Sequence, residues 1–386
     1  MLTARRAAEI EPFEVMDVLS RAHALEAQGR RVVHMEIGEP DFTATAPVVE
    51  AGVRAIRDGL TAYTAALGLP ALREAISEHY GRAFSTKLEP GRIAVTSGAS
   101  GGLLTVAALY VDAGDEVLVP DPGYPGYRHF VRAFEGVARP LRVSAKENFQ
   151  PTLEQVRAAW GPRTKGLLIG SPSNPTGTLI PRDELRRIAE FIAGRGGVLM
   201  VDEIYQGLTY GEAPWTALGL PGEVVVINSF SKYFCMTGWR LGWVVLPARS
   251  VREFEKLAQH LFISAPAAAQ HAACAAFSKD SLSVLEERRR EFAARRDFLL
   301  PALRGAGLVV PAEPKGAFYV YADCGRDSRA YAGDLLEKEA VAATPGADFG
   351  ANGTGTCVRF AYTRGLADLE EAAERIRRFA ACASAA

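Results

Sequence analysis

Short apolar runs alternate with helical stretches through the middle of the chain, from about residue 90 to 250. Each run ends in turn residues and is rich in β-branched side chains: residues 93–96, 116–120, 166–170, 198–201, 224–228 and 243–246. Uninterrupted apolarity of this kind is typical of strands buried on both faces, as in a parallel sheet covered by helices. The pattern predicts an α/β fold, in which ligands bind beyond the carboxyl ends of the strands.

The two ends of the chain carry a different pattern. Apolar residues recur at helical spacing over residues 10–29, and this stretch stops at a glycine. Beyond the central region we predict helices over residues 280–305, 331–339 and 367–379, and strands over 317–321 and 357–361. Helices and strands mixed in this way indicate an α+β unit.

These patterns predict how the chain divides into domains. A chain of 386 residues is long enough for two domains of ordinary size. We expect a large domain over residues 46–280 and a smaller one over 281–386. Residues 1–45 would form an N-terminal segment that packs with the smaller domain.

Composition excludes several classes of function. The 45 acidic residues nearly cancel the 44 basic ones, so no overall field favours nucleic acid or an anionic membrane. No stretch approaches the roughly 18 apolar residues that a membrane span needs. The five cysteines are scattered without metal-ligand spacing, so we expect no metal site and a reducing, cytoplasmic location.

Lys232 is the first candidate for chemistry. It ends the loop SFSK (229–232) after the apolar run 224–228, and Arg240 follows eight residues later. A lysine at a strand end, beside two hydroxyls, can be desolvated and form an imine with a carbonyl cofactor. A lone lysine is more often simply exposed to solvent. The neighbouring loops must therefore decide between the two interpretations.

Two of those loops carry Asp202, Tyr205 and Asn174. Asp202 follows the run 198–201, and a buried carboxylate there needs a cation, such as a protonated pyridinium nitrogen, unless it caps a helix. In SPSNPTG (171–177) two prolines and a glycine constrain the backbone and hold the Asn174 amide as a donor. A turn without a ligand is the alternative for this loop.

The loop TSGASGG (96–102) lies between a predicted strand and a helix that begins near Ser100. Small residues let backbone amides approach a phosphate at the start of a helix. The loop matches neither the nucleoside triphosphate nor the dinucleotide motif. It either binds a phosphate or caps the helix without a ligand.

Together these loops resemble the class I and II aminotransferases, which are fold type I pyridoxal phosphate enzymes. The matching pieces follow the family's order from about residue 10 to 378: IGEPDF (37–42), YTAALGLPALREAI (63–76), the 96–102 loop, DEVLVPDPGYPGY (115–127), SPSNPTG, VDEIY (201–205), SFSKYFCMTGWRLGW (229–243), GAFYV (316–320), TPGADFG (344–350) and VRFAYT (358–363). The resemblance implies a large domain with a mostly parallel sheet flanked by helices, and a smaller α+β domain.

The resemblance also implies a role for each loop. Lys232 would bind pyridoxal 5'-phosphate as a Schiff base, Asp202 would keep its ring nitrogen protonated, and Tyr205 and Asn174 would hold its ring oxygen. The residues implied for the phosphate are Gly98, Ala99, Ser100, Ser229, Ser231 and Arg240. Tyr124 would stack on the ring. Tyr63 would reach the phosphate of a neighbouring subunit, which implies a homodimer with shared active sites.

The substrate side of the implied site rests on Arg359. Its planar fork would bind the α-carboxylate of an amino acid, helped by Asn174 and the backbone of Gly38. Residues Phe13, Met16 and Ile37 suggest an apolar pocket for the substrate side chain. We find no second arginine placed for a dicarboxylate, so aspartate is not the expected substrate.

The expected function is amino transfer from an L-amino acid to a 2-oxo acid by a ping-pong mechanism. A carbon-sulfur β-lyase is the alternative, because such an enzyme shares the cofactor machinery. A regulator that senses an effector with this fold is a further alternative. Regulators of that type carry a DNA-binding domain before the segment IGEPDF, and too few residues precede it here.

Overall fold

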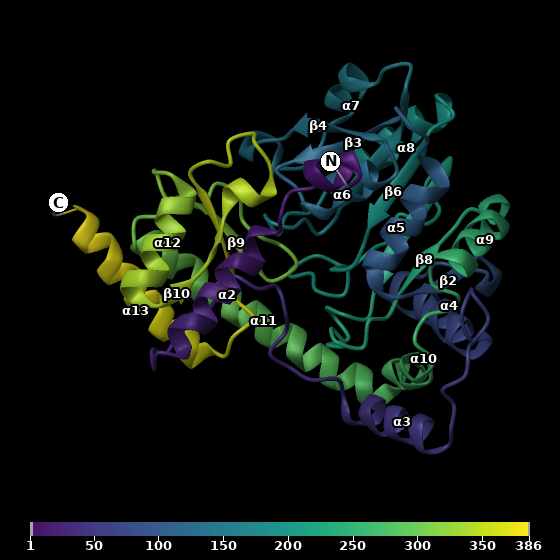
Figure 1. Ribbon diagram of the computed structural model, residues 1–386, viewed down its shortest axis with the longest axis horizontal. Coiled ribbons are helices and arrows are strands. Elements are labelled where there is room, and N and C mark those ends of the chain that lie inside the picture. The colour runs from purple at the N-terminus through teal and green to yellow at the C-terminus, as the bar shows by residue number, and fades with distance from the viewer. Residues whose placement is uncertain (1–2, 385–386) are drawn as a thin grey trace.

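A seven-stranded sheet forms the centre of the computed structural model, which describes residues 3–384 (Figure 1). The strand order is β2-β8-β7-β6-β5-β3-β4, and all neighbours are parallel except β8, which runs antiparallel to β2 and β7. The bounds are β2 Ile93–Thr96, β3 Glu116–Asp121, β4 Val137–Arg142, β5 Thr164–Gly170, β6 Val198–Asp202, β7 Glu223–Ser229 and β8 Gly242–Val245. The predicted mostly parallel α/β sheet is confirmed.

The edge strand β4 has no counterpart among the predicted strands. Within it only Leu141 is buried, and Pro140 interrupts its backbone donors. A strand at the edge of a sheet tolerates both features, because one side of it has no neighbour to pair with. The apolar runs therefore indicate the central strands and miss this edge.

Helices cover both faces of the sheet, as the alternation along β6 illustrates. Leu199 and Val201 pack with α4, α7, α8 and α10, while Val198 and Met200 pack with α5, α6 and α9 on the opposite face. The bounds are α3 Ala46–Arg57, α4 Pro70–Phe84, α5 Gly98–Tyr110, α6 Gly126–Ala133, α7 Leu153–Ala159, α8 Arg182–Gly194, α9 Val251–Leu261 and α10 Ala267–Cys274. Burial on both faces explains why the runs show no polar alternation.

The C-terminal part is built on a second sheet with the order β11-β12-β9. The long helix α11 leads to it from the large sheet (Figure 1). The bounds are β9 Tyr319–Asp323, β11 Thr344–Pro345, β12 Cys357–Ala361, α11 Lys279–Gly305, α12 Ser328–Glu339 and α13 Leu366–Ser384. Strand β9 begins two residues later than predicted, because Ala317 has a φ of 57° and cannot continue an extended strand.

The N-terminal segment contacts both parts of the molecule. Its elements are α1 Arg5–Glu9, α2 Glu14–Glu26 and β1 Val33–His34, and β1 pairs in parallel with β10, Val341–Ala342. Ion pairs join Glu9 of α1 to Arg132 of α6, and Arg21 of α2 to Glu337 of α12. The predicted helix over 10–29 is wrong at its start, because Pro12 precedes the first turn and the helix begins at Glu14.

The predicted division of the chain into domains at residues 45 and 280 stays a prediction. The first and last residues of the predicted domains, 1–2 and 385–386, lie outside the described residues.

Short 3-10 helices link the other elements, at Pro90–Arg92, Ala145–Glu147, Ala248–Ser250, Ala275–Phe277 and Gly346–Phe349. Between residues 3 and 384, no helix has both the length and the apolarity to cross a membrane.

Candidate active site

A pocket of about 280 Å³ lies at the edge of the sheet where β2, β5, β6 and β7 end. The antiparallel β8 starts at this same edge, since Gly242 pairs with Thr96 and with Ser229. Its direction brings the loop that holds Arg240 beside the lysine loop. The predicted site residues that line the pocket are Gly38, Ala99, Ser100, Tyr124, Asn174, Asp202, Tyr205, Ser229, Ser231, Lys232, Arg240 and Arg359.

Lys232 is held inside this pocket. Its Nζ donates a hydrogen bond to the backbone oxygen of Gly38 at 2.5 Å. Burial, together with the positive charges of Arg359 and Arg240, lowers the pKa of Lys232 to about 8. A neutral amine, which is the form that attacks a carbonyl, is therefore accessible near neutral pH.

Asp202, the last residue of β6, is a buried carboxylate that forms no ion pair with any described residue. Only 3% of it is exposed. Its Oδ2 accepts from the Tyr127 hydroxyl at 2.9 Å, and its Oδ1 accepts from the Ile204 backbone at 3.2 Å within a turn that starts no α-helix. Burial raises the pKa of Asp202 to about 6, against the effect of these two hydrogen bonds. The helix-cap interpretation is therefore wrong, and the carboxylate is poised to meet a cation.

Arg359, on β12, is the complementary case of a buried cation without an anion. It is 2% exposed and forms no ion pair with any residue from 3 to 384. Its Nη1 donates to Asn174 Oδ1 at 2.9 Å and its Nη2 to Thr344 Oγ1 at 3.1 Å and to the Glu36 carbonyl, while Nε has no partner. These contacts hold the guanidinium in one orientation at the pocket wall, ready for an anion.

The start of α5 and Arg240 form a second place for an anion. The amides of the first turn of α5 have no intrahelical partner, as in any helix, and no described side chain caps them. A Cβ at Gly98, where φ is 73°, would lie 2.6 Å from Arg240 Nη2, so glycine is needed for the guanidinium to approach the helix. Arg240 itself donates to the Thr237 carbonyl at 2.9 Å and, within the described chain, joins no ion pair. This arrangement suits a phosphate.

The tyrosines of the site divide into two groups. The hydroxyls of Tyr205 and Tyr319 are 2.8 Å apart, and burial raises the pKa of Tyr205 well above its usual value. Tyr124 lies edge-on to Tyr127 with ring centroids 5.3 Å apart, and burial raises the pKa of Tyr124 to about 12. Tyr63 is 80% exposed and does not line the pocket of its own chain.

Sequence reasoning missed two of these tyrosines as site residues. Tyr127 is the second tyrosine of DPGYPGY, and its hydroxyl binds Asp202. Tyr319 lies within the apolar run GAFYV and presents its hydroxyl to the pocket. A buried tyrosine needs a hydrogen-bond partner for its hydroxyl, and this requirement could have indicated both residues as site candidates.

Apolar side chains form one wall of the pocket. Phe13 and Met16, at the start of α2, line it together with Val15 and with Ile37. The three residues suggested for the substrate side chain, Phe13, Met16 and Ile37, all line the pocket, and their contact with a substrate stays a prediction. Because all four residues lie within residues 1–45, the N-terminal segment completes the site.

Comparison with known proteins agrees with this geometry. The sequence model of the family "Aminotransferase class I and II" matches residues 30–376. The chain is 38% identical to the (5-formylfuran-3-yl)methyl phosphate transaminase of Methanocaldococcus jannaschii, over 98% of this chain and 99% of that protein. It is 37% identical to the valine–pyruvate aminotransferase of Mycobacterium tuberculosis, over 96% of each.

Solved structures give the same result. The crystal structure of an aminotransferase from Mycobacterium tuberculosis has a TM-score of 0.94 to this chain at 36% identity, and the match covers 99% of this chain and 100% of that one. Family, relatives and fold therefore agree over nearly the whole length. The chain is an aminotransferase and belongs to the class I and II family.

Proposed function

We propose that this aminotransferase binds pyridoxal 5'-phosphate in the pocket and uses it to move an amino group from an L-amino acid to a 2-oxo acid. One observation carries the proposal: the pocket gathers charged groups that form no ion pair within the described part of the chain. Lys232, Arg240 and Arg359 are cations without an ion pair among residues 3–384, and Asp202 is a carboxylate without a cation. A phosphate, a ring nitrogen and a substrate carboxylate would complement them.

The residues fit the cofactor group by group. Arg240, the amides at the start of α5 and the hydroxyls of Ser229 and Ser231 would hold the phosphate. Asp202 would hold the ring nitrogen. Tyr205 and the Asn174 amide nitrogen, which donates to no described residue, would hold the ring oxygen, with Tyr124 against the ring face. Bound pyridoxal phosphate supplies an electron-accepting ring that stabilises negative charge on the amino acid's Cα.

Lys232 and Arg359 would divide the remaining work. Arg359 would bind the α-carboxylate through its fork and thereby fix the direction of the Cα–H bond. The Lys232 amine, with a pKa of about 8, can accept the Cα proton and return it at a second carbon. The apolar wall would keep bulk water away from the proton transfer, which strengthens the electrostatic interactions inside the pocket.

The apolar wall supports a substrate with an apolar or aromatic side chain. Arg240 and Arg359 are the two arginines among the described pocket residues, and both have other proposed roles. The relatives act, by their names, on a furan phosphate and on valine with pyruvate. We therefore propose that a second carboxylate on the substrate finds no dedicated cation here.

A donor panel tests this function. We expect valine, leucine and phenylalanine to convert the bound cofactor to its amino form faster than aspartate does, with amino transfer that requires a 2-oxo acid. The measurement is the change of the cofactor spectrum after mixing with each donor. Release of pyruvate and ammonia from a β-substituted donor without any 2-oxo acid would instead indicate the carbon-sulfur β-lyase.

The Tyr127→Phe variant tests the role proposed for Asp202. The lost hydrogen bond should raise the pKa of Asp202, because the Tyr127 hydroxyl stabilises its charged form. Cofactor affinity, which needs the carboxylate ionised, falls as pH drops through this pKa, so the fall should begin roughly 1–2 pH units higher in the variant. Cofactor titrations from pH 5 to 8 measure it. Tyr110→Phe, which removes a hydroxyl bonded to Ser250, is the control; identical profiles for Tyr127→Phe and wild type would contradict the role.

We propose a homodimer in which Tyr63 serves the neighbouring active site. Its 80% exposure supports a role outside its own pocket. If sites are shared, mixing inactive Lys232→Ala chains with Tyr63→Ala chains should restore activity, because one site of each hybrid has both native residues. No recovery, together with a monomer in sedimentation, would exclude sharing.

We also propose a cytoplasmic location. All five cysteines are free thiols, and Cys382 is exposed, which suits a compartment that keeps thiols reduced. Recovery of the enzyme in a secreted or periplasmic fraction would contradict this.

A further inference from the structure

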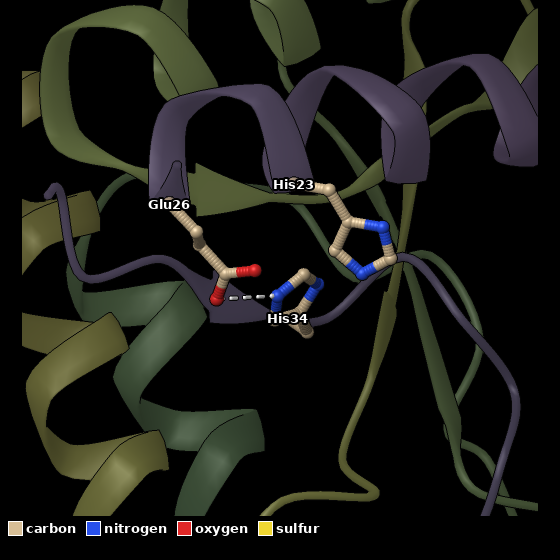
Figure 2. A group of neighbouring side chains, drawn as sticks. All are labelled: His23, Glu26 and His34. Carbon is tan, nitrogen blue, oxygen red and sulfur yellow. Dashed lines mark hydrogen bonds and ion pairs between the residues drawn. The ribbon is translucent and has the colours of Figure 1, made fainter. Parts of the chain in front are cut away.

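Two histidines and a glutamate meet outside the active site, between α2 and β1. His23 and Glu26 are exposed on one face of α2, and His34 is buried on β1. Figure 2 shows the three side chains converging. One nitrogen or oxygen atom from each lies within 4.8 Å of the other two.

A buried carboxylate orients the central histidine. Glu36, which is fully buried, binds His34 Nδ1 through Oε1 at 2.7 Å. The opposite ring nitrogen, Nε2, is thereby turned towards Glu26 Oε1, 3.1 Å away. Metal-binding histidines are commonly held in this way, with the second ring nitrogen bonded to a carboxylate.

The rest of the cluster is suited to ligation. The ring nitrogens of His23 bond to no other described side chain or backbone group, and the exposed His23 side chain can rotate. Backbone hydrogen bonds from the Val33 amide to the Ala340 carbonyl and from the Met35 amide to the Ala342 carbonyl hold His34 in place. Tetrahedral zinc with ligands at about 2.0–2.1 Å needs the ligand atoms roughly 3.4 Å apart, so a modest rotation of His23 completes the site.

We propose that His23, Glu26 and His34 bind a divalent transition-metal ion of the zinc type, with water in the fourth position. Two imidazoles and one carboxylate favour such an ion over magnesium or calcium, which prefer oxygen ligands. This departs from the expectation of no metal drawn from the sequence. The inference does not depend on the proposed amino transfer.

The site would connect the N-terminal helix to the active site. The ion would tie α2, whose first turn carries Val15 and Met16 of the pocket wall, to β1. Two residues beyond His34, the backbone oxygen of Glu36 accepts from Arg359 Nη2. The metal ion would therefore fix the position of α2 relative to β1 and so stabilise the apolar wall of the pocket.

Zinc and cobalt titrations of the tag-free, cofactor-loaded protein test the proposal. We expect one Zn²⁺ per chain by calorimetry, and visible cobalt bands at wavelengths above the cofactor's absorption. His23→Ala and Glu26→Gln should weaken zinc binding by more than about 10–100-fold, the loss typical when an outer partner of a metal-bound histidine is removed. Zinc should also raise the melting temperature of wild type but not of His23→Ala.

His260→Ala is the matched control, because His260 is also exposed on a helix, α9, far from the cluster in sequence. It should bind zinc as wild type does. Two results would mean that the cluster binds no metal: zinc binding by His23→Ala as tight as by wild type, or no zinc binding by wild type. In that case a protonated His34 would only form ion pairs with Glu26 and Glu36. Either result would overturn the proposal.

Discussion

The Lys232→Ala variant is expected to lose at least about 10²–10⁴-fold in the rate of amino transfer, the usual contribution of a positioned group that moves a proton. The physical reason is that no other amine lines the pocket among the described residues. Stopped-flow measurement of the donor-driven change in the cofactor spectrum isolates this step from substrate release. In wild type, borohydride should also fix the cofactor to the peptide that contains Lys232.

The control for this variant is Lys256→Ala. Lys256 is exposed on α9 and pairs with Glu253, so its loss should leave the rate unchanged. Circular dichroism verifies that both variants are folded. Full transamination by Lys232→Ala, with a cofactor that borohydride still attaches to the chain, would sink the assignment.

The Arg359→Ala variant should weaken the binding of amino acid donors by about 2–5 kcal/mol, or about 30-fold to several-thousand-fold, because the α-carboxylate would lose its buried partner. Cofactor affinity should change far less, since the phosphate is assigned to Arg240. The measurement is the donor concentration that half-saturates the spectral change. The free protein should also lose some stability, because the variant removes the donor to Asn174 Oδ1, Thr344 Oγ1 and the Glu36 carbonyl.

A donor that lacks the carboxylate makes this prediction sharper. Wild type should prefer an amino acid over its amide by a large factor, and Arg359→Ala should lose most of that preference. Arg359→Lys, which keeps the charge but not the fork, should fall between the two. Arg296→Ala is the control, because Arg296 binds Pro314 and Asp297 away from the pocket. An unchanged preference in Arg359→Ala would assign the carboxylate to another group.

Local pattern was sufficient for the elements that the core buries. The run at residues 93–96 became β2 without a shift, and 357–361 became β12, since both strands are buried throughout and are apolar except at Thr96 and Arg359. The local pattern missed β4, where burial is partial. It also misplaced the starts of α2 and β9, where Pro12 and the backbone conformation of Ala317 set the boundary. Such positions depend on neighbours that a short window does not contain.

The candidate site follows the same division. Lys232, Asp202 and Asn174 could be proposed because each follows an apolar run, and the ends of parallel strands meet at one edge. The partners of these residues could not be found in this way. Tyr127 reaches Asp202 across 75 positions in the chain, and Asn174 reaches Arg359 across 185.

The sequence by itself determined the central strands, the loops that carry chemistry and the family they resemble, because hydrophobic periodicity and local turn chemistry act over a few residues. Only the tertiary structure decided which charges lack a counter-charge. A free energy of burial depends on everything packed around a group, whatever its distance along the chain. For the same reason, only the folded structure shows that Arg359 is a buried cation without an ion pair among the described residues. It also brings together His23, Glu26 and His34, the proposed metal ligands.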